Sequence, residues 1–372
     1  CIVQAANPDD HVFKVTADYV NISGFTVEGA TGVWKAGISL YSTYCSISAN
    51  TILSNYWGIY LTSSNNNITG NSIYSNSGDG IYLKGAKNNN LTNNNISNNE
   101  DGIELRGHSC GNILANNNVY SNHYDGIRLL SCTASGNTLA NNTNYHNRCG
   151  IYIECGGGNN VKDNVVHNNS AGISLSGTDG NILTKNNASN NSRGISLYSS
   201  CNNIITNNTA LNNGYGIRLK GVTTGNKIYL NNFLSNTENA YIGLGYPSNV
   251  EVINIWNSPD EITYTYNGNT YTNYLGNYWD DYTGSDADGD GIGDTPYSID
   301  GDKDNYPLVE RFENYFGGVE EEYNPKVSVP PYAPFAEYGH VGTNLTFIIK
   351  VENKGTKEDT IDLTARPYYP AR

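Results

Sequence analysis

The chain has 372 residues, which is enough for one large domain and a smaller one. Its formal net charge of −14 argues against binding to nucleic acids or to anionic membranes. No apolar run in the sequence approaches the roughly 20 residues of a membrane-spanning helix. Methionine is absent and the sequence begins inside a repeating pattern, which predicts a processed or partial chain.

The first and largest part of the chain is a repeat of Gly-Ile-x-Leu. The copies begin at Gly37, Gly58, Gly80, Gly102, Gly126, Gly150, Gly172, Gly194 and Gly216. Within each copy the two apolar residues are two positions apart, so a strand places both on one face. A fixed short period is typical of a solenoid, in which each unit buries its apolar face against its neighbours.

Two further apolar ladders follow in every repeat. The second comprises Ile47, Ile68, Leu91, Ile113, Leu139, Val161, Ile182, Ile204 and Ile228. The third comprises Ile52, Ile73, Ile96, Val119, Asn144, Val165, Ala188, Ala210 and Phe233, with Asn144 as an unexplained polar member. Three short strands per repeat predict an all-β fold, a right-handed three-sided parallel β-helix of about ten coils over residues 1–246.

Two columns of asparagine accompany the third ladder. One precedes it at Asn50, Asn71, Asn94, Asn117, Asn142, Asp163, Asn186, Asn208 and Asn231. The other follows it at Asn55, Asn76, Asn99, Asn122, Asn147, Asn168, Asn191, Asn213 and Asn236. Asparagine tolerates the left-handed backbone angles of turns, and its amide both donates and accepts hydrogen bonds. We therefore predict a structural role, with amides bonded to one another along the helix axis.

The remainder of the chain divides into three segments. Residues 247–316 are rich in tyrosine and in turns, and we expect them to form strands that close the β-helix. Residues 317–334 carry a Gly pair, three consecutive glutamates and several prolines, which is typical of a linker. Residues 335–372 alternate like strands but are too few for a complete domain, so we expect a partial Ig-like β-sandwich module.

An acidic loop in the closing segment predicts a calcium site. Asp286, Asp288, Asp290 and Asp294 occupy positions 1, 3, 5 and 9, with a glycine at position 6 and the carbonyl of Ile292 at position 7. This spacing is that of a calcium loop built from hard oxygen ligands. The bidentate glutamate expected at position 12 is missing, and Asp300, Asp302 and Asp304 are candidates to complete the shell. We expect bound Ca²⁺ to have a structural role.

The outer face of the first strand carries the candidate ligand-binding and catalytic residues. Tyr60, Tyr82, Lys84, Arg106 and Tyr152 offer rings and charges for sugars or for another subunit, and Glu104 and Arg128 are expected to pair across strands. Asp79, Asp101 and Asp125 precede the glycines of three successive coils, which would stack carboxylates about 5 Å apart. Such stacking raises pKa values, as general-acid chemistry requires, although Asp-Gly is also simply a favoured turn.

The chain also resembles a known family. The repeats, the segment from Gly276 to Gly284 (Gly-Asn-Tyr-Trp-Asp-Asp-Tyr-Thr-Gly) and the Asp-Gly loop that leads to Tyr306-Pro307-Leu308 are similar to those of archaeal NosD-like surface proteins. This resemblance covers about residues 1–312. It implies a parallel β-helix located in the cell envelope, related in fold to a periplasmic protein of copper-enzyme maturation. The tail resembles a cell-adhesion-type β-sandwich module.

The resemblance makes copper binding a hypothesis to examine. His146 and His167 occupy matching positions in adjacent coils, with Cys149 and His123 nearby. Among the cysteines, one disulfide is predicted, either Cys110–Cys132 or Cys132–Cys155. Sequons at Asn344, Asn67 and Asn90 are the glycosylation candidates, whereas the sequon at Asn168 should be blocked by burial.

These observations favour an extracellular structural protein without enzymatic activity. We expect a calcium-stabilised, glycosylated subunit that associates with itself in a surface layer, sheath or filament, because unclosed solenoid ends stack readily. The alternative is a carbohydrate-binding or polysaccharide-processing protein that uses the tyrosine-rich face and the aspartate stack. A weaker alternative is a NosD-like copper-maturation protein.

Overall fold

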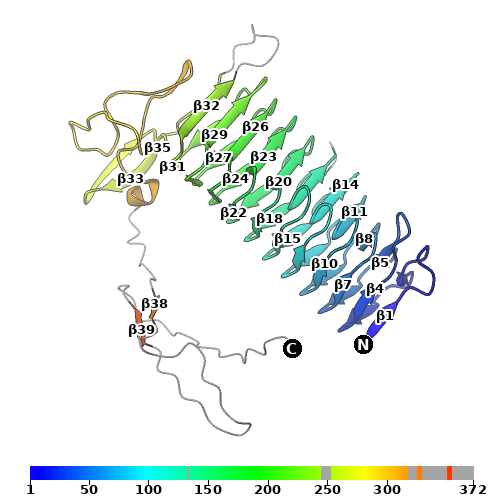
Figure 1. The fold of residues 1–372 in the computed structure, drawn as a ribbon. Helices are drawn as coiled ribbons and strands as arrows, with labels where there is room; N and C mark the ends of the chain where they lie inside the picture. The colour runs from blue at the N-terminus through cyan, green and yellow to red at the C-terminus, as the bar shows by residue number, and fades with distance from the viewer. Residues whose placement is uncertain (132–133, 244–252, 317–324, 329–349, 354–372) are drawn as a thin grey trace. The chain divides into compact units, whose positions relative to one another are not determined.

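A computed structural model describes residues 1–131, 134–243, 253–316, 325–328 and 350–353 (Figure 1). The chain forms two compact units, Cys1–Phe312 and Glu313–Arg372. The first unit is built on a three-sided parallel β-helix, as predicted, in which each strand of the coils pairs with the equivalent strand one coil away. Among the described residues, no helix is long and apolar enough to cross a membrane.

Each side of the β-helix is one parallel sheet. Sheet A contains β1 (Ile2–Gln4), β4 (Thr26–Glu28), β7 (Thr51–Leu53), β10 (Ser72–Tyr74), β13 (Asn95–Ser97), β16 (Asn118–Tyr120), β19 (Thr143–Tyr145), β22 (Val165–His167), β25 (Asn187–Ser189), β28 (Thr209–Leu211), β31 (Asn232–Leu234) and β35 (Tyr278–Trp279). Sheet B contains β2 (Phe13–Val15), β5 (Ala36–Leu40), β8 (Trp57–Leu61), β11 (Ile81–Lys84), β14 (Ile103–Arg106), β17 (Ile127–Leu130), β20 (Cys149–Glu154), β23 (Ala171–Ser176), β26 (Arg193–Tyr198), β29 (Tyr215–Lys220) and β32 (Glu238–Gly243). Sheet C contains β3 (Asn21–Ser23), β6 (Ser46–Ser48), β9 (Asn67–Thr69), β12 (Asn90–Thr92), β15 (Ile113–Ala115), β18 (Thr138–Ala140), β21 (Asn160–Lys162), β24 (Ile182–Thr184), β27 (Ile204–Thr206) and β30 (Lys227–Tyr229).

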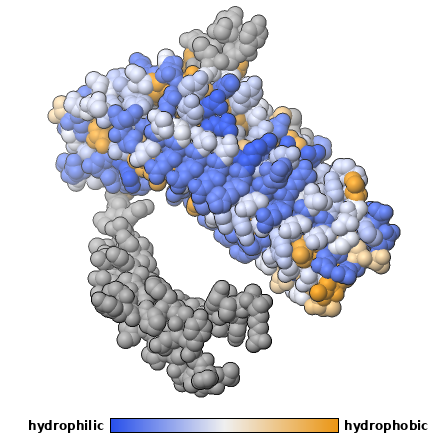
Figure 2. Space-filling view, viewed as in Figure 1, coloured by the Kyte–Doolittle hydropathy of each residue, from blue (hydrophilic) through white to orange (hydrophobic). Residues whose placement is uncertain are grey.

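The core is a single apolar column inside the three sheets. The Ile and Leu of each Gly-Ile-x-Leu point inward from sheet B and are completely buried. The repeat glycine is required by close packing: a Cβ at Gly80 would lie 2.7 Å from the carbonyl oxygen of Gly102 and 3.0 Å from the amide of Asn99. Outside this column, the surface of the coils seen in Figure 2 is largely hydrophilic.

The asparagine columns are hydrogen-bonded ladders along the axis, as expected. In most steps the Oδ1 of one asparagine accepts both the backbone N–H and the side-chain amide of the asparagine one coil earlier, as between Asn71 and Asn94 at 3.1 and 3.0 Å. A third ladder was missed by the sequence reading. It consists of Asn66, Asn89, Asn112, Asn137, Asn159, Asn181, Asn203, Asn226 and Asn254.

The sequence reading was wrong by one residue in four strands. The structure buries Leu114, Val166, Leu183 and Ile205 in place of Ile113, Val165, Ile182 and Ile204. Likewise, Asn164 and Asn169 belong to the ladders instead of Asp163 and Asn168. Because strand side chains alternate between faces, a slip of one residue moves a side chain from the core to the solvent. Asn168 is therefore not in the inward column, and its backbone φ is +55°.

The last coil of the β-helix continues into a cap of aromatic residues. Phe233 stacks on Trp279 at 4.5 Å between ring centroids, and Trp279 stacks on Tyr297 at 4.4 Å, so rings extend the core column beyond its aliphatic part. This region also contains two antiparallel pairs, β33 (Ile262–Tyr266) with β34 (Asn269–Asn273) and β36 (Tyr297–Ile299) with β37 (Asp302–Asp304). A short 3-10 helix, η1 (Phe312–Tyr315), follows in the sequence at the boundary between the two units.

The second unit contributes one described pair of strands. β38 (Pro325–Ser328) and β39 (Lys350–Asn353) are antiparallel. The predicted β-sandwich module at 335–372 lies mostly outside the described residues, and so does most of the expected linker at 317–334. Both therefore stay predictions.

Candidate functional site

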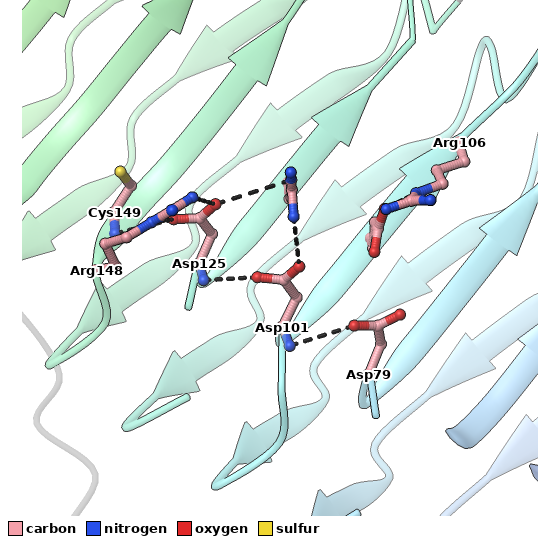
Figure 3. A network of polar contacts seen from close by, with 8 residues as sticks. Asp79, Asp101, Arg106, Asp125, Arg148 and Cys149 are labelled. Atoms are coloured by element: carbon pink, nitrogen blue, oxygen red, sulfur yellow. Dashed lines mark hydrogen bonds and ion pairs between the residues drawn. The ribbon is translucent and has the colours of Figure 1, made fainter. Parts of the chain in front are cut away.

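Three aspartates on the sheet B side form a column across successive coils (Figure 3). Asp79, Asp101 and Asp125 each precede a repeat glycine, and all three are buried. Oδ1 of each aspartate accepts the backbone N–H of the equivalent residue in the next coil. Asp79 accepts from Asp101 at 3.3 Å, Asp101 accepts from Asp125 at 2.7 Å, and Asp125 accepts from Cys149 at 3.1 Å. These hydrogen bonds join successive coils, so the aspartates have a structural role, as the Asp-Gly turns predict. The three carboxylates differ, however, in their cationic partners.

The positive charge that compensates these carboxylates decreases toward the N-terminal coils. Arg148 donates two hydrogen bonds to Asp125, of 3.1 Å from Nε and 2.7 Å from Nη2. Asp101 receives one contact, 3.2 Å from Nη1 of Arg128. Among the described residues, no arginine, lysine or histidine pairs with Asp79. Asp79 is therefore the carboxylate for which ionisation is least favourable.

The pKa values of the aspartates follow this order. Burial, together with the charges of Glu104 and Asp101, raises the pKa of Asp79 well above its usual range. Burial raises the pKa of Asp101 to about 6, although the N–H of Asp125 and the charge of Arg128 counteract it. Asp79 therefore holds its proton more readily than a solvent-exposed aspartate does, next to Asp101, which a guanidinium contacts, and general acid–base chemistry uses such unequal pairs of carboxyl groups.

A fourth carboxylate, Glu104, completes the cluster. It is buried on β14 and pairs with Arg106 two residues further along the same strand, instead of with Arg128 as the sequence suggested. The two side chains lie on one face because the strand period is two residues. One carboxylate oxygen from each of Asp79, Asp101 and Glu104 lies within 4.8 Å of the others. This group is therefore close enough for its charges to interact strongly, or for its oxygens to bind one cation.

Aromatic side chains wall the pocket in which this cluster lies. The pocket has a volume of about 160 Å³ and is lined by Trp34, Tyr56, Trp57, Asp79, Tyr82, Glu100, Asp101, Glu104, Arg106 and Arg128. Trp57 stacks with Tyr60 and Tyr82, at 4.9 and 4.8 Å between centroids, while Trp34 lies 5.3 Å from Trp57 and is 63% exposed. Gly78 permits this arrangement, since a Cβ there would lie 3.0 Å from the Trp57 ring.

The candidate ligand-binding residues from the sequence are only partly brought together. Tyr60 and Tyr82 stack in the aromatic wall at 5.6 Å, and burial raises the pKa of Tyr82 to about 12. Lys84 and Arg106 lie next to each other in register at the ends of β11 and β14. Tyr152 lies apart from the pocket lining, under the guanidinium of Arg148 at 5.7 Å.

Four residues of the pocket lining, Trp34, Tyr56, Trp57 and Glu100, were missed by the sequence reading. Trp57 directly precedes a repeat glycine, as Asp79 and Asp101 do, so its position beside the aspartates could have been predicted from the repeat. Tyr56 and Glu100 share a second repeat position, two residues before a repeat glycine, and could have been found in the same way. Trp34 lies in a turn outside the aligned repeat positions, where no such signal exists.

The acidic loop gathers part of its predicted ligand set. Carboxylate oxygens of Asp286, Asp288 and Asp290 lie within 4.8 Å of one another. Asp286 accepts the backbone N–H groups of Gly289, Asp290 and Gly291, and the two glycines have φ values of +73° and +91°. Asp294 instead accepts from Ser285 and from the N–H of Ala287. The loop has the donor set for Ca²⁺, and Ca²⁺ binding stays a prediction.

The three other candidate calcium ligands have separate partners. Asp300 accepts the N–H of Ile242, and Asp302 accepts the indole N–H of Trp256 at 2.8 Å. Asp304 is fully buried and accepts from Asn277, Trp279 and Tyr306. Each of these carboxylates fixes a strand or ring of the cap, and none belongs to the cluster around Asp286.

The histidines do not form a metal site within the described part of the chain. His167 stacks on Tyr145 at 5.0 Å and contacts Asn168, whereas His146 and His123 lie edge-on to tyrosines. Neither of the two groups of potential metal ligands among the described residues contains a histidine or cysteine. Burial raises the pKa of Cys149 to about 12, so its thiol is a poor ligand.

The disulfide and glycosylation predictions are only partly covered by the structure. Both disulfide alternatives involve Cys132, which lies outside the described residues, as does the sequon residue Asn344. Asn67 and Asn90 are exposed on sheet C, which is compatible with modification, and glycosylation there stays a prediction.

Comparison with solved structures identifies the same fold in polysaccharide-processing proteins. The mannuronan C-5 epimerase AlgE6 A-module of Azotobacter vinelandii is 15% identical, with 63% of this chain and 73% of that chain covered and a TM-score of 0.53. A mannuronic acid specific polysaccharide family 6 lyase enzyme from human gut microbiota is 13% identical, with 67% and 72% covered and a TM-score of 0.51. At these identities the similarity concerns the fold.

Comparison with families is more specific. No curated protein matches the chain. The family model for NosD, described as a periplasmic copper-binding protein, matches residues 4–133 and 108–284. These residues make up well over half of the 372, and the chain therefore belongs to the NosD family.

Proposed function

We propose that this protein binds a polysaccharide on the outer face of sheet B and cleaves it by acid–base chemistry in the pocket at Asp79, Asp101 and Glu104. The observation that carries the proposal is the contact of three buried carboxylates within 4.8 Å, at a pocket walled by tryptophan and tyrosine. The sequence pattern favoured a structural subunit, because only the folded chain places Trp34 and Trp57 beside the aspartates.

The aromatic wall supports sugar binding. A sugar ring presents an apolar face that packs on an aromatic ring and a rim of hydroxyl groups that need hydrogen-bond partners. Trp34 offers a largely exposed indole at the pocket, and the carboxylates and Arg106 supply acceptors and donors next to it. The pocket therefore provides both kinds of contact that a sugar requires.

The unequal carboxylates support bond cleavage. In the proposed step, Asp79 donates its proton to the glycosidic oxygen, which leaves with the departing sugar. The ionised Asp101 adds to the anomeric carbon, and a water molecule, deprotonated by Asp79, then displaces Asp101 from the sugar and restores both groups; glycosidases use this pathway when the two carboxyl groups lie about 5 Å apart. Arg128 keeps Asp101 ionised, while the lack of a cationic partner among the described residues keeps Asp79 protonated. The two solved relatives in fold also act on polysaccharides, as their names state.

The test uses conservative variants and a panel of neutral and acidic polysaccharides. We expect Asp79→Asn and Asp101→Asn each to reduce the release of reducing ends by about 100-fold or more, the usual contribution of a general acid or base. Asparagine still accepts the backbone N–H of the next coil, so the fold is retained. Asp179→Asn is the matched control, because Asp179 accepts the N–H of Cys201 in the same manner away from the pocket.

Binding is tested separately by substitution of two exposed aromatic residues that share the left-handed backbone conformation. Trp34 has φ +68° and Tyr44 has φ +58°, and they are 63% and 54% exposed. Trp34→Ala should weaken oligosaccharide binding measured by calorimetry, whereas Tyr44→Ala should not. Equal effects of both variants, or turnover that survives in Asp79→Asn, would contradict the proposal.

The remaining expectations stay predictions. The family description names copper, but His123, His146, His167 and Cys149 do not fit a copper site, and no step is assigned to copper here. An exported location, periplasmic or extracellular, agrees with the family description and with a function on polysaccharides. Self-association into a surface assembly is tested by electron microscopy of the native protein with and without a calcium chelator.

A further inference from the structure

A second group of residues on sheet B lies C-terminal to the pocket and has no role in the proposed cleavage. Arg193 on β26 and Arg218 on β29 project from the outer face of neighbouring strands, where Arg193 is in register with Tyr215 and Arg218 with Ser196. Both are half-buried, in a protein whose net charge is −14.

These arginines differ from the three near the pocket. Arg106, Arg128 and Arg148 each form an ion pair with Glu104, Asp101 or Asp125. Arg193 and Arg218 form no ion pair with any described residue, and the Nε of each is buried without a hydrogen-bond partner there. The Nε of Arg128 is buried in the same way. What distinguishes Arg193 and Arg218 is therefore that they have no carboxylate partner among the described residues, which leaves their terminal nitrogens suited to an anionic acceptor from outside the chain.

The neighbouring rings hold Arg218 in position. Its guanidinium carbon lies 5.7 Å from the ring centroids of both Tyr215 and Tyr241, which fixes the plane of the group by cation–π contacts. Arg193 is oriented by one hydrogen bond of 3.3 Å from Nη2 to the hydroxyl of Ser170. A guanidinium held in this way presents its donors to a carboxylate or sulfate with little loss of conformational entropy.

One row of outward-facing residues on sheet B connects the pocket with these arginines. In the row that contains Arg128 and Tyr152, the next two residues are Ser174 and Ser196, followed by Arg218. The serine side chains are short and project little from the outer face of the sheet. Successive coils repeat at about 4.8 Å, which is close to the length of one sugar residue in an extended chain. A linear polymer that leaves the pocket along the helix axis therefore passes over the serines and reaches the arginines.

We infer that the substrate is a linear acidic polysaccharide whose carboxylate or sulfate groups bind Arg193 and Arg218 while another part of the chain occupies the pocket. This inference rests on the proposed function and specifies its substrate class. It predicts a dependence on oligomer length: short oligosaccharides fill the pocket alone, and longer acidic ones contact the arginines as well. It also predicts that the additional affinity decreases with salt.

The experiment compares binding of uronic acid oligomers of four and ten residues, and of neutral oligomers of the same lengths, by calorimetry on the full chain. The double variant R193Q/R218Q should weaken binding of the acidic decamer about tenfold or more, as expected for the loss of charge-assisted hydrogen bonds. It should leave the acidic tetramer and both neutral oligomers unchanged. The control K162Q/K185Q removes the same charge at positions on and near sheet C, Lys162 on β21 and the exposed Lys185.

The outcomes separate the two proposals. An acidic decamer whose binding is unaffected by R193Q/R218Q, or weakened equally by K162Q/K185Q, overturns the inference about the arginines. If Trp34→Ala still weakens binding in that case, the pocket proposal stands. If wild-type protein binds neutral oligomers but no acidic ones, the substrate class is wrong and the pocket proposal again stands. If no oligomer of either kind binds, both proposals fail.

Discussion

At the scale of single residues, Asn144 is a polar side chain in an apolar position. It lies on β19 between Val119 and Val166 and is completely buried. Neither its Oδ1 nor its Nδ2 has a hydrogen-bond partner among the described residues. We expect Asn144→Val to raise the free energy of unfolding by about 1–3 kcal/mol, the cost of burying an unsatisfied amide.

Asn142, two residues earlier, provides the matched comparison. It is equally buried, but its amide donates to the carbonyl of Leu114 and to Asn164, and its oxygen accepts from Asn117. Asn142→Val should therefore lower the free energy of unfolding, in contrast to Asn144→Val. Denaturant unfolding of both variants measures the difference. A loss of stability in Asn144→Val similar to that in Asn142→Val would mean that Asn144 has partners that stabilise it.

Asp101 gives a prediction for the pH dependence of activity at the proposed site. Its pKa is raised to about 6 and that of Asp79 is raised well above its usual range, so the active form has Asp101 ionised and Asp79 protonated. Activity should increase as pH rises through about 6 and decrease again where Asp79 loses its proton. Arg128→Gln removes a positive charge 3.2 Å from Asp101 and should move the acidic limb of the pH–rate profile to higher pH. An acidic limb that stays in place in this variant would exclude Asp101 as its origin.

At the scale of structural elements, two of the three asparagine ladders end in carboxylates. Asn231 donates to Asn277, and Asn277 donates its backbone and side-chain N–H groups to Asp304, at 2.7 and 3.2 Å. The second ladder ends where Asn239 donates to Asp280 and Asp281. In every Asn–Asn pair that joins successive coils of these ladders, the N–H groups of one coil donate to the Oδ1 of the next coil toward the C-terminus. The last residue of the ladder therefore accepts hydrogen bonds but has no further asparagine to which it could donate. A carboxylate, which only accepts when ionised, fits this place.

Burial nevertheless raises the pKa of Asp304 to about 6, above its value of about 3.8 in the unfolded chain. The folded protein thus holds this proton more tightly than the unfolded chain, and its stability decreases as pH rises from about 4 to above 6. Two pKa units correspond to about 3 kcal/mol. Asp304→Asn lacks this pH-dependent contribution. From pH 4 to pH 7 its free energy of unfolding should therefore increase, relative to that of wild type, by up to about 3 kcal/mol. Urea unfolding at both pH values measures the change, and a relative loss at pH 7 would show that the four donated hydrogen bonds outweigh burial.

The sequence predicts the architecture because each coil repeats the same local requirements. Gly-Ile-x-Leu carries both the close packing at the glycine and the alternation of the strand, and nine copies leave no doubt about the period. The errors of register fall where two apolar residues are adjacent, as in Ile113-Leu114 and Ile182-Leu183, because hydrophobicity alone cannot choose between them. The third asparagine ladder resolves them, since Asn112 and Asn181 stand two residues before the buried leucines.

At the scale of the whole molecule, the site depends on residues that the repeat does not align. The sequence identifies Asp79 and Asp101, since both precede repeat glycines, but not the difference in their pKa values. That difference comes from the burial of Asp79 beside Glu104 and from Arg128, which contacts Asp101 from the next coil. Trp34 joins the pocket from a turn before β5. Such contacts depend on side-chain geometry, which residue spacing does not specify.

The cap at the C-terminal end of the β-helix connects the predicted calcium loop to the core. Ile292 in the loop forms a backbone bridge with Leu308, which also bridges to Tyr278 on β35, and β35 pairs with β31 of the last full coil. Tyr264 and Tyr271 donate hydrogen bonds from the hairpin β33–β34 to the carbonyls of Asp290 and Gly289. Order in the loop is thereby transmitted to the strands that cover Phe233 and Trp279.

Calcium should consequently stabilise the whole β-helix and not only the loop. At a free Ca²⁺ concentration of about 100 times Kd, binding to the folded state alone contributes about 2.7 kcal/mol, which raises Tm by several degrees in a domain of this size. We expect Ca²⁺ to raise Tm and a chelator to lower it in wild type, and neither to act on D286N/D288N. The variant D9N/D10N removes two exposed acidic charges from the other end of the β-helix and should respond like wild type. If D9N/D10N loses the response too, the effect reflects screening of the net charge of −14, and the loop is then a hydrogen-bonded turn that does not require the cation.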